Sequence, residues 1–208
     1  MKRQPLIIFI LDRAHGINVS GKQSPDGSFK EWEYSDRFVN DLAREAMKLK
    51  IPFAFTCRDD KEPGLTNRVQ RGNFYAMGYD IPIFLSFHNN GGGGTGMELY
   101  TSPGFDQSDI VAEIIAKRLI ADFPELRFRR GSATELDKEA EFTVIAGNQK
   151  VEPEYLGVLL EFLFMDNEND LKLLKDESIY NRYLEAILMA MVEICKHFNV
   201  GNFLIPEE

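Results

Sequence analysis

The chain has 208 residues, and its 44% hydrophobic content with 16 phenylalanines is enough for one sizeable core. A formal net charge of -9 argues against nucleic acid or an anionic membrane as the main partner, because both bind basic surfaces. No stretch approaches the ~20 apolar residues of a membrane span. Cys57 and Cys195 do not have zinc-finger spacing, so we expect two buried thiols.

The N-terminus has a basic start followed by a short apolar run at 6–11. A signal peptide would have a longer apolar region and a cleavage site of small residues, whereas this run ends in charge at Asp12 and Arg13. We therefore interpret the run as a buried strand, and we expect the protein to be cytoplasmic as synthesised.

Apolar runs then alternate with segments in which apolar residues recur every three or four positions. Strands are predicted at 6–11, 51–56, 81–87, 96–101 and 156–162, and helices at 32–50, 67–78, 106–122, 167–175 and 178–198. A short strand at 126–130 and either a strand or a single turn at 142–145 are further candidates. This alternation predicts an α/β fold, with a twisted, mostly parallel sheet and helices on both faces. Without repeats or linkers, we expect one domain over 1–208.

Ionisable residues stand at the ends of several predicted strands. His15 follows the first strand, His88 ends the third, and Glu161 lies inside the last. The carboxyl ends of parallel strands share one edge of the sheet, so these side chains can meet, and a polar loop at 18–27 can bring in Glu31. Two histidines and a carboxylate form a common zinc site with an open fourth position. A second carboxylate can then act as general base.

Each residue also has a structural interpretation. A single histidine after a strand is more often a loop residue than a ligand, and Glu161 can form a structural ion pair with an arginine instead of working in a site. Glu31, with its neighbours Glu33 and Asp36, can simply be negative charge at a helix N-terminus. We expect His197, in the last helix, to be a surface or packing residue.

A family resemblance favours the site. It rests on five short stretches in order: LDRAHG, SPDGSFKEWEYSDR, FLSFHNN, GMELYTSPG and LLEFLFMDN. Together they resemble zinc-dependent N-acetylmuramoyl-L-alanine amidases of the amidase-3 type, most of all versions encoded by Bacteroidetes and their phages. The resemblance extends over essentially the whole chain and implies the amidase-3, phosphorylase/hydrolase-like fold.

The resemblance also implies roles for single residues. His15, Glu31 and His88 match the ligands of Zn2+, and Glu161 matches the catalytic base. Glu31 is preferred to Glu33 because it directly follows DGSFK, where the family motif has its ligand.

The activity implied is hydrolysis of the amide between N-acetylmuramic acid and L-alanine in peptidoglycan, by a phage-type endolysin that acts on the wall after release. A zinc peptidase acting on the stem peptide, or a non-catalytic wall-binding module, are the alternatives. One departure is Leu163, because similar sequences commonly have glycine two residues after the catalytic glutamate, although the usual Phe and Asn have counterparts in Phe164 and Asn167. The glycines at 91–94 are expected to border a groove for a glycan strand.

Overall fold

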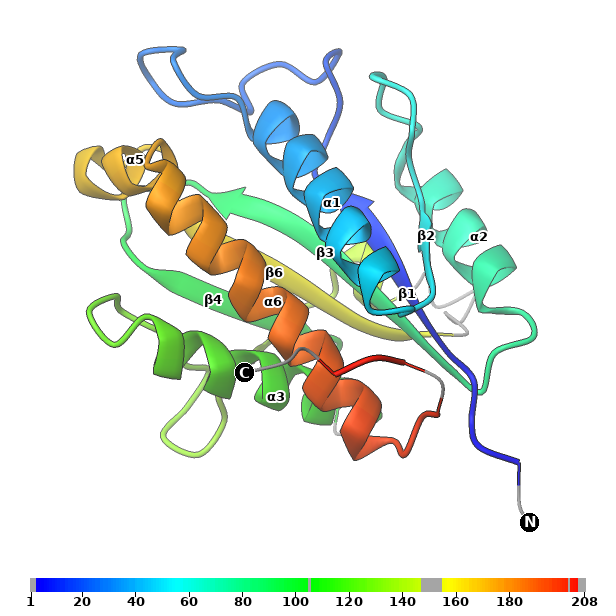
Figure 1. Ribbon diagram of the computed structural model, residues 1–208. Helices are drawn as coiled ribbons and strands as arrows, with labels where there is room; N and C mark the ends of the chain where they lie inside the picture. Colours follow the sequence, from blue (N-terminus) through cyan, green and yellow to red (C-terminus); the bar gives the residue numbers. More distant parts are fainter. Residues whose placement is uncertain (1–2, 105, 147–154, 202, 206–208) are drawn as a thin grey trace.

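The structure is a computed structural model that describes residues 3–104, 106–146, 155–201 and 203–205. Its centre is a six-stranded sheet with strand order β2-β1-β3-β6-β4-β5 (Figure 1). The strands are β1 Ile7–Arg13, β2 Phe53–Phe55, β3 Ile81–Asn90, β4 Met97–Thr101, β5 Lys138–Glu139 and β6 Leu156–Phe164. β2, β1, β3 and β6 are parallel, β4 is antiparallel to β6, and β5 is parallel to β4. The predicted mostly parallel α/β sheet is confirmed.

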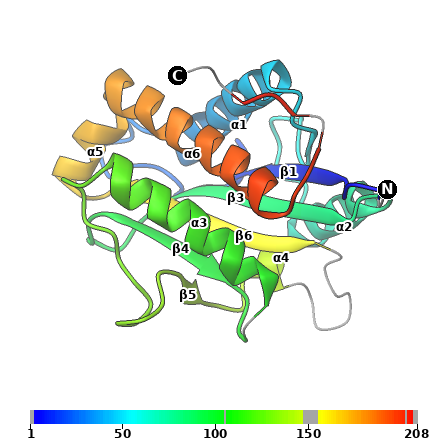
Figure 2. The ribbon, with the colours of Figure 1, turned by 60° about the horizontal axis from the view of Figure 1, so that its bottom comes forward.

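Helices cover both faces of this sheet, as expected. They are α1 Glu31–Lys48, α2 Leu65–Ala76, α3 Gln107–Asp122, α4 Thr143–Ala146, α5 Glu168–Leu174 and α6 Glu177–His197. α1, α3 and α6 lie together on one face, and α2 and α4 lie on the other (Figures 1 and 2). Alternate residues of β1 enter the two cores: Phe9 and Leu11 face the larger one, Ile8 and Ile10 the smaller.

Several element ends differ from the prediction. β1 continues through Asp12 and Arg13, both about 1% exposed, because the Asp12 carboxylate is paired with Arg68 at 2.6 Å. β3 continues beyond His88 to residue 90, where it still pairs with β6. The candidate strand at 126–130 contributes only one isolated bridge, at Phe128, and 142–145 overlaps the single helical turn α4.

Both cysteines are free and buried, in agreement with the sequence analysis. None of the helices in the described ranges combines the length and the hydropathy needed to span a bilayer.

Candidate active site

The first two site residues come together where β1 and β3 end. The two strands pair in parallel, and beyond β1 the Ala14 N–H still donates to the Phe87 carbonyl at 3.0 Å. His15 then adopts a φ of 49°, a left-handed conformation that is uncommon outside glycine, and the chain leaves the sheet. Its ring lies edge-on to that of His88, with centroids 5.1 Å apart.

Glu31 reaches the same place through a loop that closes on itself. Gln23 and Lys30 form an isolated antiparallel bridge across this loop, and the buried Phe29 anchors it. The Glu31 N–H donates to the Lys22 carbonyl at 3.1 Å. The loop therefore sets where α1 begins, and its first residue, Glu31, is only 1% exposed.

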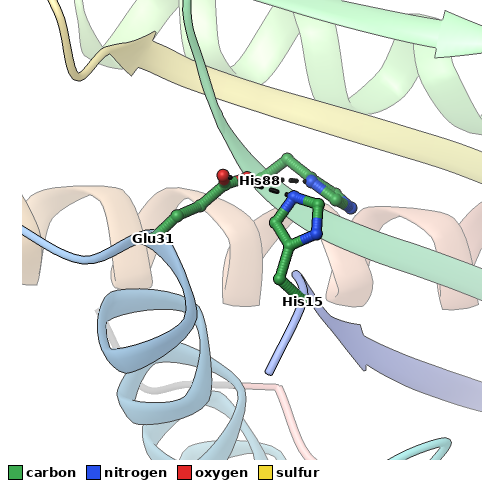
Figure 3. Close-up of side chains that lie close together, drawn as sticks. All are labelled: His15, Glu31 and His88. Carbon is green, nitrogen blue, oxygen red and sulfur yellow. Dashed lines mark hydrogen bonds and ion pairs between the residues drawn. The ribbon is translucent and has the colours of Figure 1, made fainter. Parts of the chain in front are cut away.

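The two imidazoles and the carboxylate face one another (Figure 3). Glu31 Oε1 lies 2.9 Å from His88 Nδ1 and accepts a hydrogen bond from the Asn89 N–H at 3.2 Å. Glu31 Oε2 lies 3.3 Å from His15 Nε2, but the pair lacks hydrogen-bond geometry, so this buried oxygen has no hydrogen-bond partner among the described residues. One potential ligand atom from each residue lies within 4.8 Å of the others.

The charges of this cluster suit a cation. Burial by itself would raise the pKa of Glu31, but the neighbouring His15 and His88 outweigh it and keep that pKa well below its usual range. Burial would lower the pKa of His88, and its contact with Glu31 reverses this and raises it. Glu31 is therefore an anion at neutral pH. Two imidazole nitrogens and one carboxylate oxygen are donors that zinc prefers.

Glu161 lies beside the cluster on β6. It stands opposite His88 on β3 and opposite Glu98 on β4, so the three side chains leave the sheet on one face. Burial raises the pKa of Glu161 to about 7, against the opposing charge of His88. Its Oε2 is buried without a hydrogen-bond partner, and no arginine forms an ion pair with it in the described ranges. The ion-pair interpretation of Glu161 is therefore wrong.

A cavity of about 310 Å³ lies between the two histidines and Glu161. His15, His88 and Glu161 line it together with Lys22. Its other lining residues include Asp12, Glu62, Leu65, Arg68, Glu141 and Phe142. A substrate in this cavity would therefore contact both the cluster and the Glu161 carboxyl group.

The alternative acidic residues lie elsewhere. Glu33 forms a surface ion pair with Lys30 at 2.8 Å, and Asp36 lies 3.3 Å from Arg13 Nε. His197 is exposed on α6, as predicted. Neither acidic alternative belongs to the group of potential metal ligands.

Sequence reasoning missed the buried polar residues that surround the site. These are Asp12, Arg68, Asn89 and Glu98, each less than 5% exposed. The available signal was a charged or amide side chain next to an apolar strand, as in GMELYT for Glu98. That signal marks a buried polar group but not its partner.

The Amidase_3 family, described as N-acetylmuramoyl-L-alanine amidase, matches residues 9–193. The chain belongs to this family. It is 29% identical over 180 residues to the N-acetylmuramoyl-L-alanine amidase CwlM of Bacillus licheniformis, a match that covers 83% of this chain. The chain spans about three-fifths of that relative, since the match covers 62% of it.

Solved structures of N-acetylmuramoyl-L-alanine amidases share the fold. The catalytic domain of CwlV from Bacillus (Paenibacillus) polymyxa var. colistinus superposes with a TM-score of 0.73 at 22% identity, covering 94% of this chain and 99% of that one. An N-acetylmuramoyl-L-alanine amidase of Clostridium difficile 630 gives a TM-score of 0.75 at 21% identity, covering 93% and 98%. AmiC2 of Nostoc punctiforme gives 0.75 at 19%, covering 92% and 97%. At these identities the likeness establishes the fold.

Proposed function

We propose that this chain is a zinc-dependent amidase of peptidoglycan that hydrolyses the bond between the lactyl group of N-acetylmuramic acid and L-alanine. One observation carries the proposal: in a member of the Amidase_3 family, His15, Glu31 and His88 converge beside a half-buried Glu161. The proposal includes the role that the family resemblance implies, which is that of a phage-type endolysin. It predicts that the added protein lyses Bacteroidetes cells with a permeabilised outer membrane.

The residues present fit a zinc ion. They supply two imidazole nitrogens and a carboxylate oxygen, and the buried Glu31 Oε2 has no hydrogen-bond partner among the described residues. The Asn89 N–H fixes the orientation of the Glu31 carboxylate, as supporting contacts of metal ligands commonly do. When bound, zinc would supply Lewis acidity, which polarises an amide carbonyl and makes water acidic near neutral pH.

Glu161 would carry the proton in this reaction. A carboxyl group with a pKa of about 7 can accept a proton at neutral pH and return it. In the proposed reaction Glu161 takes a proton from the attacking water and passes it to the departing alanine nitrogen as the C–N bond breaks. One water is consumed, and the products are a lactyl carboxylate and a peptide with a free N-terminal L-alanine.

The test combines metal analysis with mass spectrometry of digested sacculi. Wild type is expected to contain about one zinc per chain, as a single catalytic site requires, and to release stem peptides that begin with L-alanine. Glu161→Ala is expected to retain zinc and lose at least about 100-fold in rate, the usual contribution of a general base. Glu33→Ala removes a surface carboxylate two residues from Glu31 and serves as the control with wild-type behaviour.

Other products would overturn the proposal. Shortened stems that remain attached to muramic acid would indicate a peptidase. Wall binding with no soluble product from wild type would indicate a non-catalytic module. Equal rates for wild type and Glu161→Ala would refute the role of Glu161.

A further inference from the structure

Arg68 is a buried arginine of α2 with every N–H donor engaged. Only 2% of it is exposed, although it lies beside the cavity of the candidate site. Its Nε and one Nη2 donor bind the Glu62 carboxylate, at 2.8 and 2.6 Å. Nη1 donates to Asp12 Oδ1 at 2.6 Å and to the Arg13 carbonyl, and Nη2 donates to the His15 carbonyl at 3.0 Å. These five bonds use the whole donor set of a guanidinium.

The two carbonyls that Arg68 binds, those of Arg13 and His15, lie on either side of the turn that determines where the His15 side chain points. Between them lies Ala14, whose N–H is already bonded to β3. A left-handed φ such as that of His15 is unfavourable for a residue with a Cβ and persists only where the surroundings fix it. A rigid planar guanidinium can bind both carbonyls at once. Lysine, with a single ammonium group, cannot reproduce this fork.

Arg68 is itself held from two sides. The Asp12 carboxylate also accepts hydrogen bonds from Thr56 and, at 2.7 Å, from Ser86 Oγ. On the other side, the chain at Glu62 packs on Gly16, where an added Cβ would lie 2.2 Å from the Glu62 nitrogen. The guanidinium is therefore fixed to β1 and β3, to the residue that follows β2, and to the loop before α2.

We propose that Arg68 is a positioning residue that holds His15 in the conformation required for metal binding. The inference depends on the proposed function, because it takes His15 to be a ligand. Arg68 does not contact the metal cluster through its own side chain. It acts through the backbone of His15, and its saturated donors leave none for substrate.

The test compares Arg68→Lys with Arg71→Lys. Arg71 lies one turn further along α2 and donates to the Thr56 carbonyl at 2.6 Å. It is the matched control, because it is also an arginine of α2 bound to a backbone carbonyl, but it does not bind the carbonyl of His15. For each protein, the zinc dissociation constant is measured by competition with a chromogenic chelator. The visible spectrum of the cobalt(II) form reports ligand geometry, and circular dichroism with urea unfolding of the metal-free protein reports folding.

Arg68→Lys is expected to raise the zinc dissociation constant about 10- to 100-fold, as loss of a contact supporting a ligand commonly does, and to alter the cobalt spectrum. Arg71→Lys is expected to change neither. If Arg68→Lys only lowers the urea midpoint, with wild-type zinc affinity and cobalt spectrum, Arg68 has a structural role and the proposal is wrong.

A milder variant covers the case in which Arg68→Lys does not fold. Glu62→Gln keeps the guanidinium and removes the charge that anchors its outer side. It is expected to weaken zinc binding severalfold, and an unchanged dissociation constant with an unchanged cobalt spectrum would overturn the proposal. A wild-type protein that binds no zinc overturns the proposed function together with this inference. Tight wild-type binding that both variants retain overturns this inference alone.

Discussion

Leu163 occupies a backbone position that favours glycine, and this gives a sharp test of the structure around Glu161. His88 pairs with Glu161, but Asn90 pairs with Phe164, so β6 has one more residue than β3 over this interval. Such a bulge often has glycine in a left-handed conformation. Leu163 has a φ of 63° and is fully buried. A glycine at this position, as the resemblance implies, would therefore have a conformational reason.

The competing effects can be estimated. Truncating a buried leucine to alanine costs about 2–5 kcal/mol. Replacing alanine by glycine normally costs a further ~0.5–1 kcal/mol. At a left-handed φ, however, any Cβ costs about 1–2 kcal/mol, and glycine removes that cost. We therefore expect Leu163→Gly to be as stable as Leu163→Ala or up to about 1.5 kcal/mol more stable.

Urea unfolding followed by circular dichroism measures the difference. Leu160 is the matched control, because it lies three residues earlier in β6, is 1% exposed and pairs regularly with Phe87 and Leu99. There we expect the usual order, with Leu160→Gly less stable than Leu160→Ala. If both positions give the same order and the same difference, the reasoning about Leu163 is refuted.

Three further outcomes are expected. Dialysis against a strong chelator should abolish release of peptides from sacculi and zinc should restore it; full activity of metal-free protein would contradict this. Burial would raise the pKa of Glu98, but Lys138 and Arg129 keep it below its usual range. Its stabilisation is therefore present above the unfolded pKa of about 4.3 and lost at lower pH. Glu98→Gln should flatten the fall in melting temperature between about pH 5 and 3; an unchanged slope would refute this. Asp166 Oδ2 accepts the Gly92 N–H at 2.6 Å. Asp166→Ala should loosen the glycine loop at 91–94, which is expected to border the groove for a glycan strand. Digestion of sacculi should then slow severalfold without loss of zinc, and an unaltered rate would count against a role for this loop.

The sheet could be predicted from the sequence because parallel strands buried on both faces appear as continuous apolar runs. The same logic located His15, His88 and Glu161, since strand ends of one sense meet at one edge. It failed for the end of β1, where Asp12 is charged yet buried. The partner that makes this burial possible, Arg68, lies 56 residues further along the chain, and no local pattern connects the two.

For a related reason, the periodicity of the chain could not decide which acidic residue of α1 faces the two imidazoles. Side chains two positions apart on a helix point in different directions, so only one of Glu31 and Glu33 can face the imidazoles. Which one does so depends on where the helix begins, and the bond from the Glu31 N–H to the Lys22 carbonyl sets that start. A shift of one residue in this loop closure would turn Glu31 away from His15 and His88 by about 100°. Which carboxylate faces the imidazoles is therefore specified by loop closure and not by the charge pattern of α1.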